Sequence, residues 1–534
     1  MQEAIRRNGA GLTVVLFFLC LFLLGLGLHR DFGISWDEPH QRFTGAVTVK
    51  HLAQRFVPSL VRGEAATLPD LDTYIDRDHG TAFELPAAAL EAVLGLTDKR
   101  DVYMFRHLLT FMVCFLGTIS VYRLAARRFA DWRLGLLAAL FMVLSPRLFA
   151  ESFYNSKDAV FMAVFAIGMT TAVSFVLTPA VRTALAFAAA TAFAIDIRLM
   201  AVILPVVATA GLVARLLRRK VPVRPTVQAW AVYLVGTFIL IVVFWVWLWS
   251  HPIDRFVEAF GNMVSFRWQG DTLLMGTMVS EKELPWFYGP VWLSVTTPPL
   301  YLLLFVVGVT GIVQRAVTRG TAFWKGDAEL QDLFFLGMAL APFITVAFSH
   351  SIIYGGWRHL YFVYPAFLLI AVRGCQWIWE EGPLRLLRRG ALVLCTAGSV
   401  LFIATWMVRA HPLHNVYFNM LAGSNLKARF DLDYWGLGNR QALEYILKND
   451  PRPRITVRAI SETPLDNAIL MIAPADRQRL VFVEGAAKAD YAVDNFYGVR
   501  SVEEAAVARD YDLFHQQRVD DEIIISIFKL KPAP

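Results

Sequence analysis

The sequence predicts an all-α polytopic membrane protein with about eleven transmembrane helices, amphipathic helices in its outer loops and a small C-terminal α/β domain. Three observations lead to this fold class. The 534 residues are 56% hydrophobic with a mean hydropathy of +0.48, too apolar for a water-soluble chain of this size. Apolar runs long enough to cross a bilayer recur along most of the length. Short β-type runs replace them only after residue 410.

The predicted spans are mostly roughly 17–25 residues long, and they lie near 11–28, 103–123, 134–150, 158–177, 182–196, 199–215, 229–249, 291–313, 330–348, 359–379 and 390–408. The first span follows Arg6 and Arg7 and lacks a small-residue cleavage site, so we interpret it as a retained signal anchor. Asp196 and Arg198 interrupt the stretch from 182 to 215, which is therefore either two short spans or one broken span.

The net charge of +7 does not indicate nucleic-acid binding, because the basic residues cluster in short loops between apolar runs. Four such loops fall on one side if there are about eleven spans, and the positive-inside rule makes that side cytoplasmic. The clusters are Arg123, Arg127, Arg128 and Arg133; Arg215, Arg218, Arg219, Lys220 and Arg224; Arg315, Arg319 and Lys325; and Arg385, Arg388 and Arg389. The N-terminus is then inside and the C-terminal tail outside.

Two domains follow from this pattern: a transmembrane domain at 1–410, whose first outer loop is 29–102, and an extracytoplasmic α/β domain at 411–534. In the outer loop, 43–56 and 82–96 are amphipathic and are expected to lie along the interface as a roof over a cavity. In the second domain we expect an amphipathic segment at 431–449 and β-type runs at 455–457, 468–472, 480–483 and 523–528. Cys20, Cys114, Cys375 and Cys395 fall in apolar runs and are interpreted as small core side chains.

Two acidic motifs lie on the predicted outer face. Asp37 and Glu38 directly follow the first span, where one carboxylate can act as a general base on an acceptor hydroxyl or amine. The alternative is a solvated interfacial helix cap. The second motif, Tyr154 to Asp158, lies between two spans and ends in Lys157 and Asp158. Asp158 is either an N-terminal helix cap or a residue of the site, and the two roles are compatible.

Cationic residues lie on the same face. Arg198 sits at the helix break, and Tyr354 to His359 precede the tenth span with Arg358 among them. An arginine facing a water-filled cavity suits phosphate, because its planar fork binds two oxygens; the alternative is an arginine that reaches the interface. The glycines before Trp357 indicate a backbone that passes close to another group. A lone histidine such as His79 is more often structural than catalytic, and we predict no catalytic metal.

Other classes of function are disfavoured. The sequence has no Ser-His-Asp, phosphate-loop or zinc motif and no ATP-binding domain, which argues against a primary pump. Its ionisable groups gather at one face rather than in the middle of the spans, which argues against an ion-coupled carrier.

Four strings resemble the GT-C superfamily of membrane glycosyltransferases: 34–38, 154–158, 356–361, and 411–419 followed by 433–436. The likeness is to the bacterial branch of the dolichyl-phosphate-mannose–protein mannosyltransferase family, which includes the lipid A aminoarabinose transferase, and it runs over about the first 435 residues. It implies transfer of a sugar, with inversion, from a polyprenyl-phosphate-linked donor to a lipid, glycan or protein acceptor. It also implies a multi-pass protein of the bacterial inner membrane whose site faces the periplasm.

The same resemblance assigns roles. Asp37 corresponds to the proposed base and Asp158 to the second-loop acid, while Glu38 assists or orients. Arg198 and Arg358 hold the leaving phosphate, and Lys157 adds positive charge there. His359 and Tyr354 are included with the phosphate-binding group, and His79 is a candidate acceptor or loop contact.

Two rival functions remain open. One is a transporter or flippase of lipid-linked sugars that uses the same cavity without chemistry, and the other is a non-catalytic assembly factor whose outer domain binds glycan. A divalent ion, Mg or Mn, acting through Asp37 or Asp158 is a further alternative. The sugar, the acceptor and the oligomeric state are not predicted.

Overall fold

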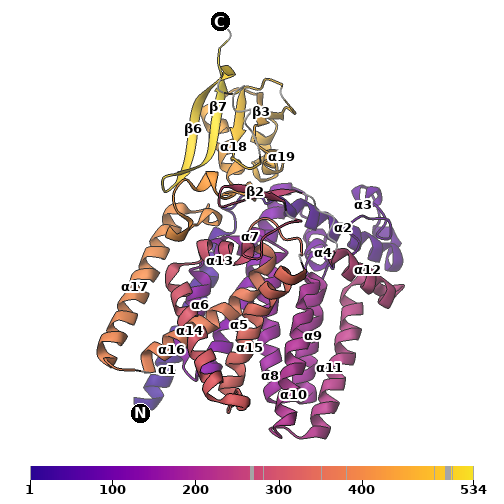
Figure 1. The fold of residues 1–534 in the computed structure, drawn as a ribbon. Helices are drawn as coiled ribbons and strands as arrows, with labels where there is room; N and C mark the ends of the chain where they lie inside the picture. Colours follow the sequence, from indigo (N-terminus) through magenta and orange to yellow (C-terminus); the bar gives the residue numbers. More distant parts are fainter. Residues whose placement is uncertain are drawn as a thin grey trace.

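A bundle of long helices makes up most of the computed structural model, which describes residues 2–264, 270–280, 282–349, 351–380, 382–485, 487–498, 507 and 509–532 (Figure 1). Within these residues, nine helices are long and apolar enough to cross a membrane. They are α1 (Gln2–Leu28), α5 (Lys99–Phe129), α8 (Asp158–Leu177), α10 (Ile203–Leu217) with the turn η2 (Leu199–Val202), α11 (Val223–Phe244), α14 (Pro299–Thr318), α15 (Asp327–Ser349), α16 (Tyr364–Glu380) with the turn η5 (Arg358–Val363), and α17 (Arg385–Ala410). The chain is a multi-pass membrane protein.

The remaining two predicted spans are shorter helices. The predicted span 134–150 is wrong as a single helix: α6 (Trp132–Val143) and α7 (Pro146–Tyr154) meet at 71°, because Pro146 lacks an amide hydrogen and begins a new helix. Counted as one span, this pair makes ten among the described residues. The stretch from 182 to 215 forms two helices, α9 (Val181–Ile197) and α10, joined at Arg198. Helix α9, with 17 residues, packs against α8 and α11.

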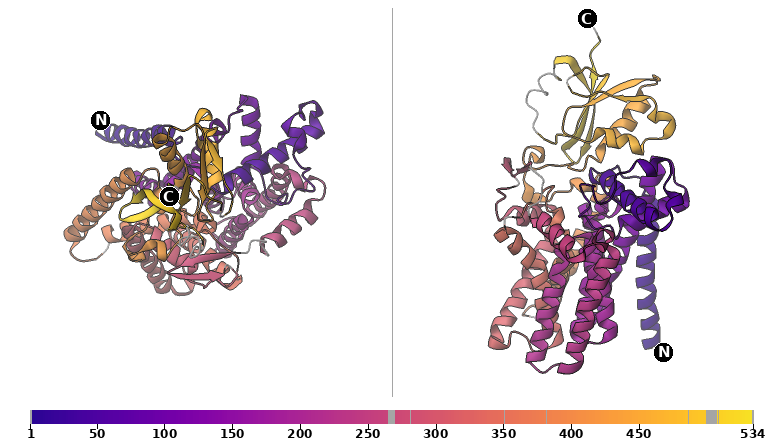
Figure 2. Two further views of the ribbon diagram at one scale, coloured as in Figure 1. Left: turned by 90° about the horizontal axis from the view of Figure 1, so that it is seen from above. Right: turned by 90° about the vertical axis from the view of Figure 1, so that its right-hand side faces the viewer.

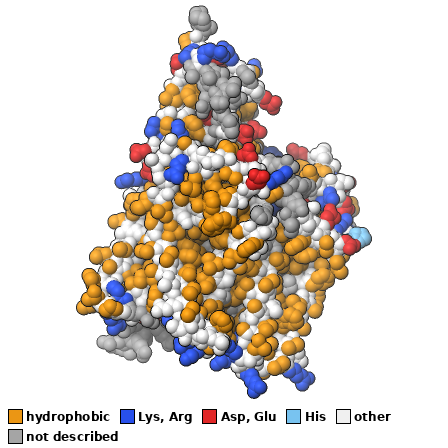
Figure 3. Space-filling view, viewed as in Figure 1, with side chains coloured by type: hydrophobic (Ala, Val, Ile, Leu, Met, Phe, Trp, Pro, Cys, Tyr) orange, Lys and Arg blue, Asp and Glu red, His pale blue; other side chains and the backbone are white. Residues whose placement is uncertain are grey.

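The two ends of the bundle differ in charge. Lys and Arg gather at the end opposite the C-terminal domain, below a broad apolar belt (Figure 3). The N-terminus lies at that basic end and the C-terminus beyond the opposite end (Figure 2). An odd number of passes therefore connects the two ends; the predicted count of eleven stays a prediction.

Short helices cover the other end of the bundle. The amphipathic segments predicted at 43–56 and 82–96 are confirmed as helices α2 (Asp37–Phe56) and α4 (Glu84–Leu94). These two pack closely, since a Cβ on Gly45 would lie 2.5 Å from the Glu84 carbonyl oxygen. Smaller elements complete this layer: η1 (Pro58–Leu60), α3 (Glu64–Thr67), η3 (Val246–Trp249), α12 (Pro252–Val264), β1 (Asp271–Leu274), β2 (Thr277–Ser280) and α13 (Tyr288–Thr296). The turn η4 (Gly320–Ala322) instead joins α14 to α15 in one of the basic loops.

A five-stranded sheet forms the core of the C-terminal domain, with strand order β4-β3-β5-β7-β6. Strand β3 pairs in parallel with β4 and β5, while β7 pairs antiparallel with β5 and β6. The elements of the C-terminal domain are η6 (His414–Val416), η7 (Met420–Ala422), η8 (Leu426–Ala428), α18 (Gly438–Asn449), β3 (Ile455–Ala459), α19 (Leu465–Ala468), η9 (Ile469–Met471), α20 (Pro474–Arg477), β4 (Leu480–Phe482), β5 (Tyr491–Asp494), β6 (Tyr511–Val519) and β7 (Glu522–Leu530).

The sheet differs from the prediction in three strands. The β-type run predicted at 468–472 is wrong: it is helical, and Met471 packs against Tyr103 and Met104 of α5 instead of joining the sheet. A short apolar run does not distinguish a strand from a buried helical turn. Strands β5 and β6 were not predicted, because β5 is buried on both faces and shows no alternating pattern, and β6 is largely polar.

The C-terminal domain is clamped onto the membrane bundle. Arg440 of α18 donates from Nη1 to the carbonyl oxygens of Arg30 and Phe32, at 2.7 and 2.8 Å. Asn419 donates to the carbonyls of Ser294 and Thr297 near α13, both at 2.6 Å. One apolar cluster contains side chains of both domains. The segment that follows the last span therefore forms part of the end of the bundle opposite the basic loops.

Candidate active site

The segment between α1 and α2 is fixed on several sides. Phe32 stacks on Phe153 of α7 with ring centroids 4.5 Å apart. A Cβ on Gly33 would lie 2.3 Å from the Leu437 carbonyl oxygen, so only glycine permits the C-terminal domain to come this close. The hydroxyl of Ser35 donates to the Tyr154 carbonyl oxygen at 3.2 Å. The start of α2, and with it Asp37, is therefore held in one place.

Asp37 and Arg358 meet at this position. Arg358 Nη1 donates to Asp37 Oδ2 at 2.5 Å, although the two residues are far apart in sequence. The Arg358 side chain is 2% exposed, whereas that of Asp37 is 31% exposed. Asp37 is thus a paired carboxylate that still faces solvent. Among the predicted site residues, it has the accessibility that a general base requires.

Asp158 extends this ion-pair chain into the protein interior. Its Oδ1 pairs with Arg198 Nη2 and its Oδ2 lies 3.4 Å from Arg358 Nη1. The interpretation of Asp158 as a helix cap is wrong, because Asn155 Oδ1 accepts the amide hydrogens of Asp158 and Lys157, at 2.7 and 3.3 Å. The Asp158 carboxylate is therefore free to hold both arginines.

Aromatic rings enclose the Arg358 guanidinium. Its central carbon lies 4.6 Å from the ring centroid of Tyr354, 4.9 Å from that of Trp435 and 5.5 Å from that of Tyr434. The glycines before Trp357 predict that the backbone passes close to another group. That group is Tyr434, since a Cβ on Gly355 would lie 2.8 Å from its ring. Cation–π contacts and the two carboxylates leave the guanidinium little freedom to turn. Tyr434 and Trp435 belong to the string 433–436 that resembles the GT-C superfamily, but they were not predicted as site residues. Nothing local in the sequence places them beside residue 358.

Lys157 is a cation with no ion pair among the described residues. Burial and the neighbouring charge of Arg198 lower the pKa of Lys157 to about 8, while Asp37 and Asp158 act in the opposite direction. The Nε of Arg198 is also buried without a hydrogen-bond partner in the described part of the chain. The site therefore has donors that its own carboxylates do not use.

The other predicted residues lie around this group. His359 Nδ1 accepts the Tyr354 amide hydrogen at 3.4 Å, and the two rings meet edge to face. His79 precedes Gly80, where a Cβ would lie 1.8 Å from the Asp196 carbonyl oxygen at the end of α9. The loop that carries His79 thus packs beside the helix break at Arg198.

Glu38 points to different partners from those of Asp37. It accepts the Ser35 amide hydrogen through Oε2 and contacts His107 Nε2 through Oε1. Neither Arg198 nor Arg358 pairs with it in the described residues.

A fully buried glutamate, Glu151, was not predicted. It accepts from the Tyr361 hydroxyl at 2.7 Å and from the Asn155 side-chain amide at 2.8 Å. Through Asn155 it supports the turn that presents Asp158. Its position after a break at Ser145–Pro146 gives a partial signal, but its partners lie in distant parts of the sequence.

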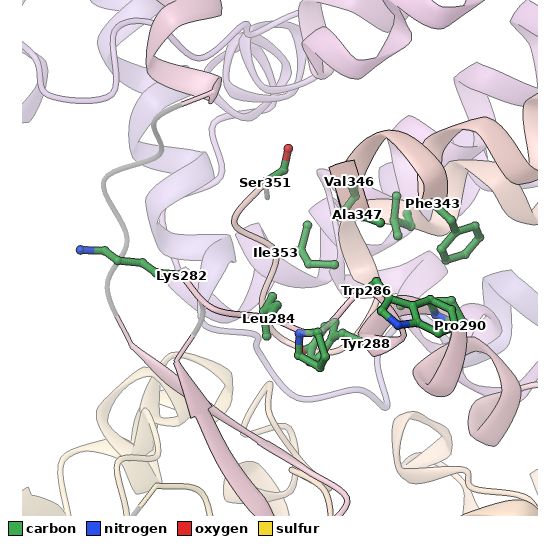
Figure 4. Close-up of a pocket in the computed structure, with 13 residues that line it drawn as sticks. Lys282, Leu284, Trp286, Tyr288, Pro290, Phe343, Val346, Ala347, Ser351 and Ile353 are labelled. Atoms are coloured by element: carbon green, nitrogen blue, oxygen red, sulfur yellow. The ribbon is translucent and has the colours of Figure 1, made fainter. Parts of the chain in front are cut away.

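An apolar pocket adjoins the site on the side of α13 and α15. Its enclosed volume is about 20 Å³, and Leu284, Trp286, Phe343 and Ile353 are among its lining residues (Figure 4). Ile353 and Leu360, which also lines it, are the chain neighbours of Tyr354 and His359. The pocket and the charged site therefore share one loop.

The carboxylates do not fit a divalent metal ion. Asp37 is already paired with Arg358, and Asp158 with Arg198 and Arg358, so a cation between the two carboxylates would have to displace these arginines. Within the described residues, no three side chains of His, Cys, Asp or Glu come close enough together to hold a metal.

No protein-family model matches the sequence, and no curated protein matches it. Two solved structures are similar over 97% of this chain and 98% of their own. They are ArnT from Cupriavidus metallidurans bound to undecaprenyl phosphate and the same protein in the apo state. Identity is 14% in both, with TM-scores of 0.46 and 0.48. A likeness at this level does not establish the function of this chain.

Proposed function

We propose that this chain is a membrane glycosyltransferase that transfers a sugar from a polyprenyl-phosphate-linked donor to a lipid, glycan or protein acceptor, with inversion. The observation that carries the proposal is the pairing of solvent-facing Asp37 with buried Arg358, which also lies against Asp158. A base and an anion-binding group are thereby held side by side. The reaction takes place on the outer face of a bacterial inner membrane.

The charges of the site suit a phosphodiester. Five charged side chains are linked or adjacent: the cations Arg198, Arg358 and Lys157, and the anions Asp37 and Asp158. Asp76 also acts on Lys157 and brings the group close to neutral, and the three cations are the groups available to the single negative charge of a sugar–phosphate–lipid linkage. Arg198 Nε and the Lys157 ammonium are the unused donors for its oxygens.

The chemistry divides between the two sides of the cluster. Asp37 takes the proton of the acceptor hydroxyl or amine as that group attacks the anomeric carbon. The bond from the anomeric carbon to the phosphate oxygen breaks, and Arg358 and Arg198 stabilise the negative charge that the phosphate gains. Attack from the face opposite the leaving phosphate inverts the anomeric centre. The helices α2 and α4 limit the access of water, which would hydrolyse the donor.

The apolar pocket supports a lipid-linked donor. It opens beside the loop that carries Tyr354 and Arg358, and its walls are mostly apolar or aromatic. Trp286, which lines it, and Phe348, which follows the lining residue Ala347, are 73% and 83% exposed. Exposed aromatic side chains of this kind suit a membrane–water interface, where an isoprenoid chain would lie along this surface beside the phosphate site.

Purified protein in liposomes tests the proposal. Polyprenyl-phosphate sugars carrying a labelled sugar are added, and product is followed by mass spectrometry against envelope lipids, glycans and proteins as acceptors. We expect label on an acceptor and release of polyprenyl phosphate in equal amounts. Movement of intact donor across the bilayer with no transfer would instead establish a flippase, and envelope glycans unchanged by removal of the protein would also count against transfer.

The state of Lys157 makes donor binding depend on pH. Its pKa of about 8 means that the ammonium is charged at pH 7 and mostly neutral at pH 9, whereas the phosphodiester keeps its charge. We therefore expect the donor KM to rise several-fold between pH 7 and pH 9. Lys157→Arg keeps its charge and should flatten this change, because arginine does not titrate in this range. An equal pH dependence in both proteins would exclude Lys157 as the cause.

A further inference from the structure

Glu38 and His107 form a buried pair directly behind Asp37. Glu38 Oε1 and His107 Nε2 are 2.8 Å apart, and the two side chains are 4% and 0% exposed. His107 lies in the middle of the first half of α5, so this contact joins the start of α2 to a membrane-spanning helix. The pair is separate from the ion-pair chain of Asp37, Arg358 and Asp158.

The hydrogen bonds around this pair require one shared proton. His107 Nδ1 lies 3.2 Å from the His29 carbonyl oxygen, which only accepts, so Nδ1 carries a hydrogen. Glu38 Oε2 accepts the Ser35 amide hydrogen at 2.7 Å. The remaining contact, from Nε2 to Oε1, is a hydrogen bond only if a proton lies between these two atoms. The pair is then imidazolium with carboxylate or imidazole with carboxylic acid, and it is neutral overall in both forms.

Charged and titratable groups surround this pair. His29 lies beside it at the end of α1, Tyr103 and Arg106 lie on α5, and Arg42 of α2 acts on Tyr103 together with Glu38. Arg106 is itself held by two buried carboxylates, Glu84 and Glu91. A second proton on the pair would place an unpaired charge in the interior, and removal of the shared proton would do the same with opposite sign.

We propose that His107 and Glu38 are positioning residues that hold the first turn of α2 through one shared proton, so that Asp37 alone accepts the proton of the acceptor. Both oxygens of Glu38 are engaged, one by Ser35 and one by His107. Ser35 in turn bonds to the Tyr154 carbonyl oxygen, next to the turn that presents Asp158. The pair thus fixes the distance between the two acidic motifs. This inference rests on the proposed function of Asp37 as base.

Glu38→Gln separates positioning from proton transfer. In this variant the amide oxygen accepts from Ser35 and the amide nitrogen donates to neutral His107, so every hydrogen bond is kept. We expect its kcat to fall by less than about threefold and the shape of its pH–rate profile to be unchanged. Glu38→Ala and His107→Leu should each lower kcat about tenfold or more, with donor KM within about twofold, because Asp37 is displaced. A Glu38→Gln variant as inactive as Asp37→Asn would overturn the proposal.

A thermal-unfolding cycle tests the pair independently of catalysis. Glu38→Ala and His107→Leu should each lower the midpoint temperature of thermal unfolding of the purified protein. The double variant should unfold at no lower temperature than the less stable of the two single variants. Glu64→Ala and Glu64→Gln, at an exposed position of α3, remove the same charge and serve as matched controls. Additive losses from the two single changes would refute the shared proton. If the wild-type protein transfers no sugar, the proposed function is wrong, but this cycle still shows whether Glu38 and His107 stabilise the protein as a coupled pair.

Discussion

Asp37→Asn lowers kcat for sugar transfer by about 10²–10⁴-fold, the range expected when a general base is removed. Asparagine has the shape of aspartate and still accepts the hydrogen bond of Arg358 through its amide oxygen, but it cannot take a proton. Arg358, which is 2% exposed, keeps this hydrogen bond and its contact with Asp158, so it is not left without a partner. Donor affinity and the melting temperature should therefore change little. Transfer rates and donor binding are measured on the same preparation.

Asp31→Asn is the matched control for this variant. Asp31 lies in the same segment, is 45% exposed and pairs with His411 rather than with a residue of the site. It removes one negative charge from the same outer surface, so a general electrostatic effect would appear in both variants. Near-normal transfer by Asp37→Asn would exclude Asp37 as the base, whereas equal losses in the two variants would point to surface charge.

The membrane helices could be predicted because the signal is local. An apolar run long enough to span the bilayer identifies itself, and the basic loops set its direction without any knowledge of packing. The same is true of α2 and α4, whose amphipathic periodicity appears within each segment. The break at Pro146 was present in the sequence but lost inside a long apolar run, so α6 and α7 were merged.

The site could be predicted only in part, because its members are joined by tertiary contacts. Asp37, Asp158, Arg198 and Arg358 stood out since ionisable groups at a membrane surface are unusual. Their pairing, with Arg358 between two carboxylates, depends on three distant segments. His107 and Glu151 gave no comparable signal, because a buried polar residue in an apolar helix does not reveal its partner, and Trp435 lies in a turn far from residue 358 in the sequence.

Arg358→Gln lowers kcat/KM about 10²–10³-fold, because the leaving phosphate loses a preorganised charged donor. Arg358→Lys should fall nearly as far. Lysine keeps the charge but lacks the planar fork that contacts Asp37 and Asp158 together, and it fills the space between Tyr354 and Trp435 poorly. Arg255→Gln is the control, since Arg255 pairs with the exposed Asp72 on the outer surface. A full rate in Arg358→Lys would show that charge alone is sufficient.

The double variant Asp37→Asn/Arg358→Gln separates the catalytic role of Arg358 from its structural role. Arg358→Gln alone should reduce the free energy of unfolding by about 1–3 kcal/mol, less than for a fully buried pair, because Asp158 keeps Arg198 and Asp37 is partly solvated. Removing the Asp37 charge as well restores the local balance, so part of this loss should return. Activity should not return, since both the base and the phosphate donor are then absent. Recovery of transfer together with stability would mean that Arg358 acts only by holding Asp37 in place.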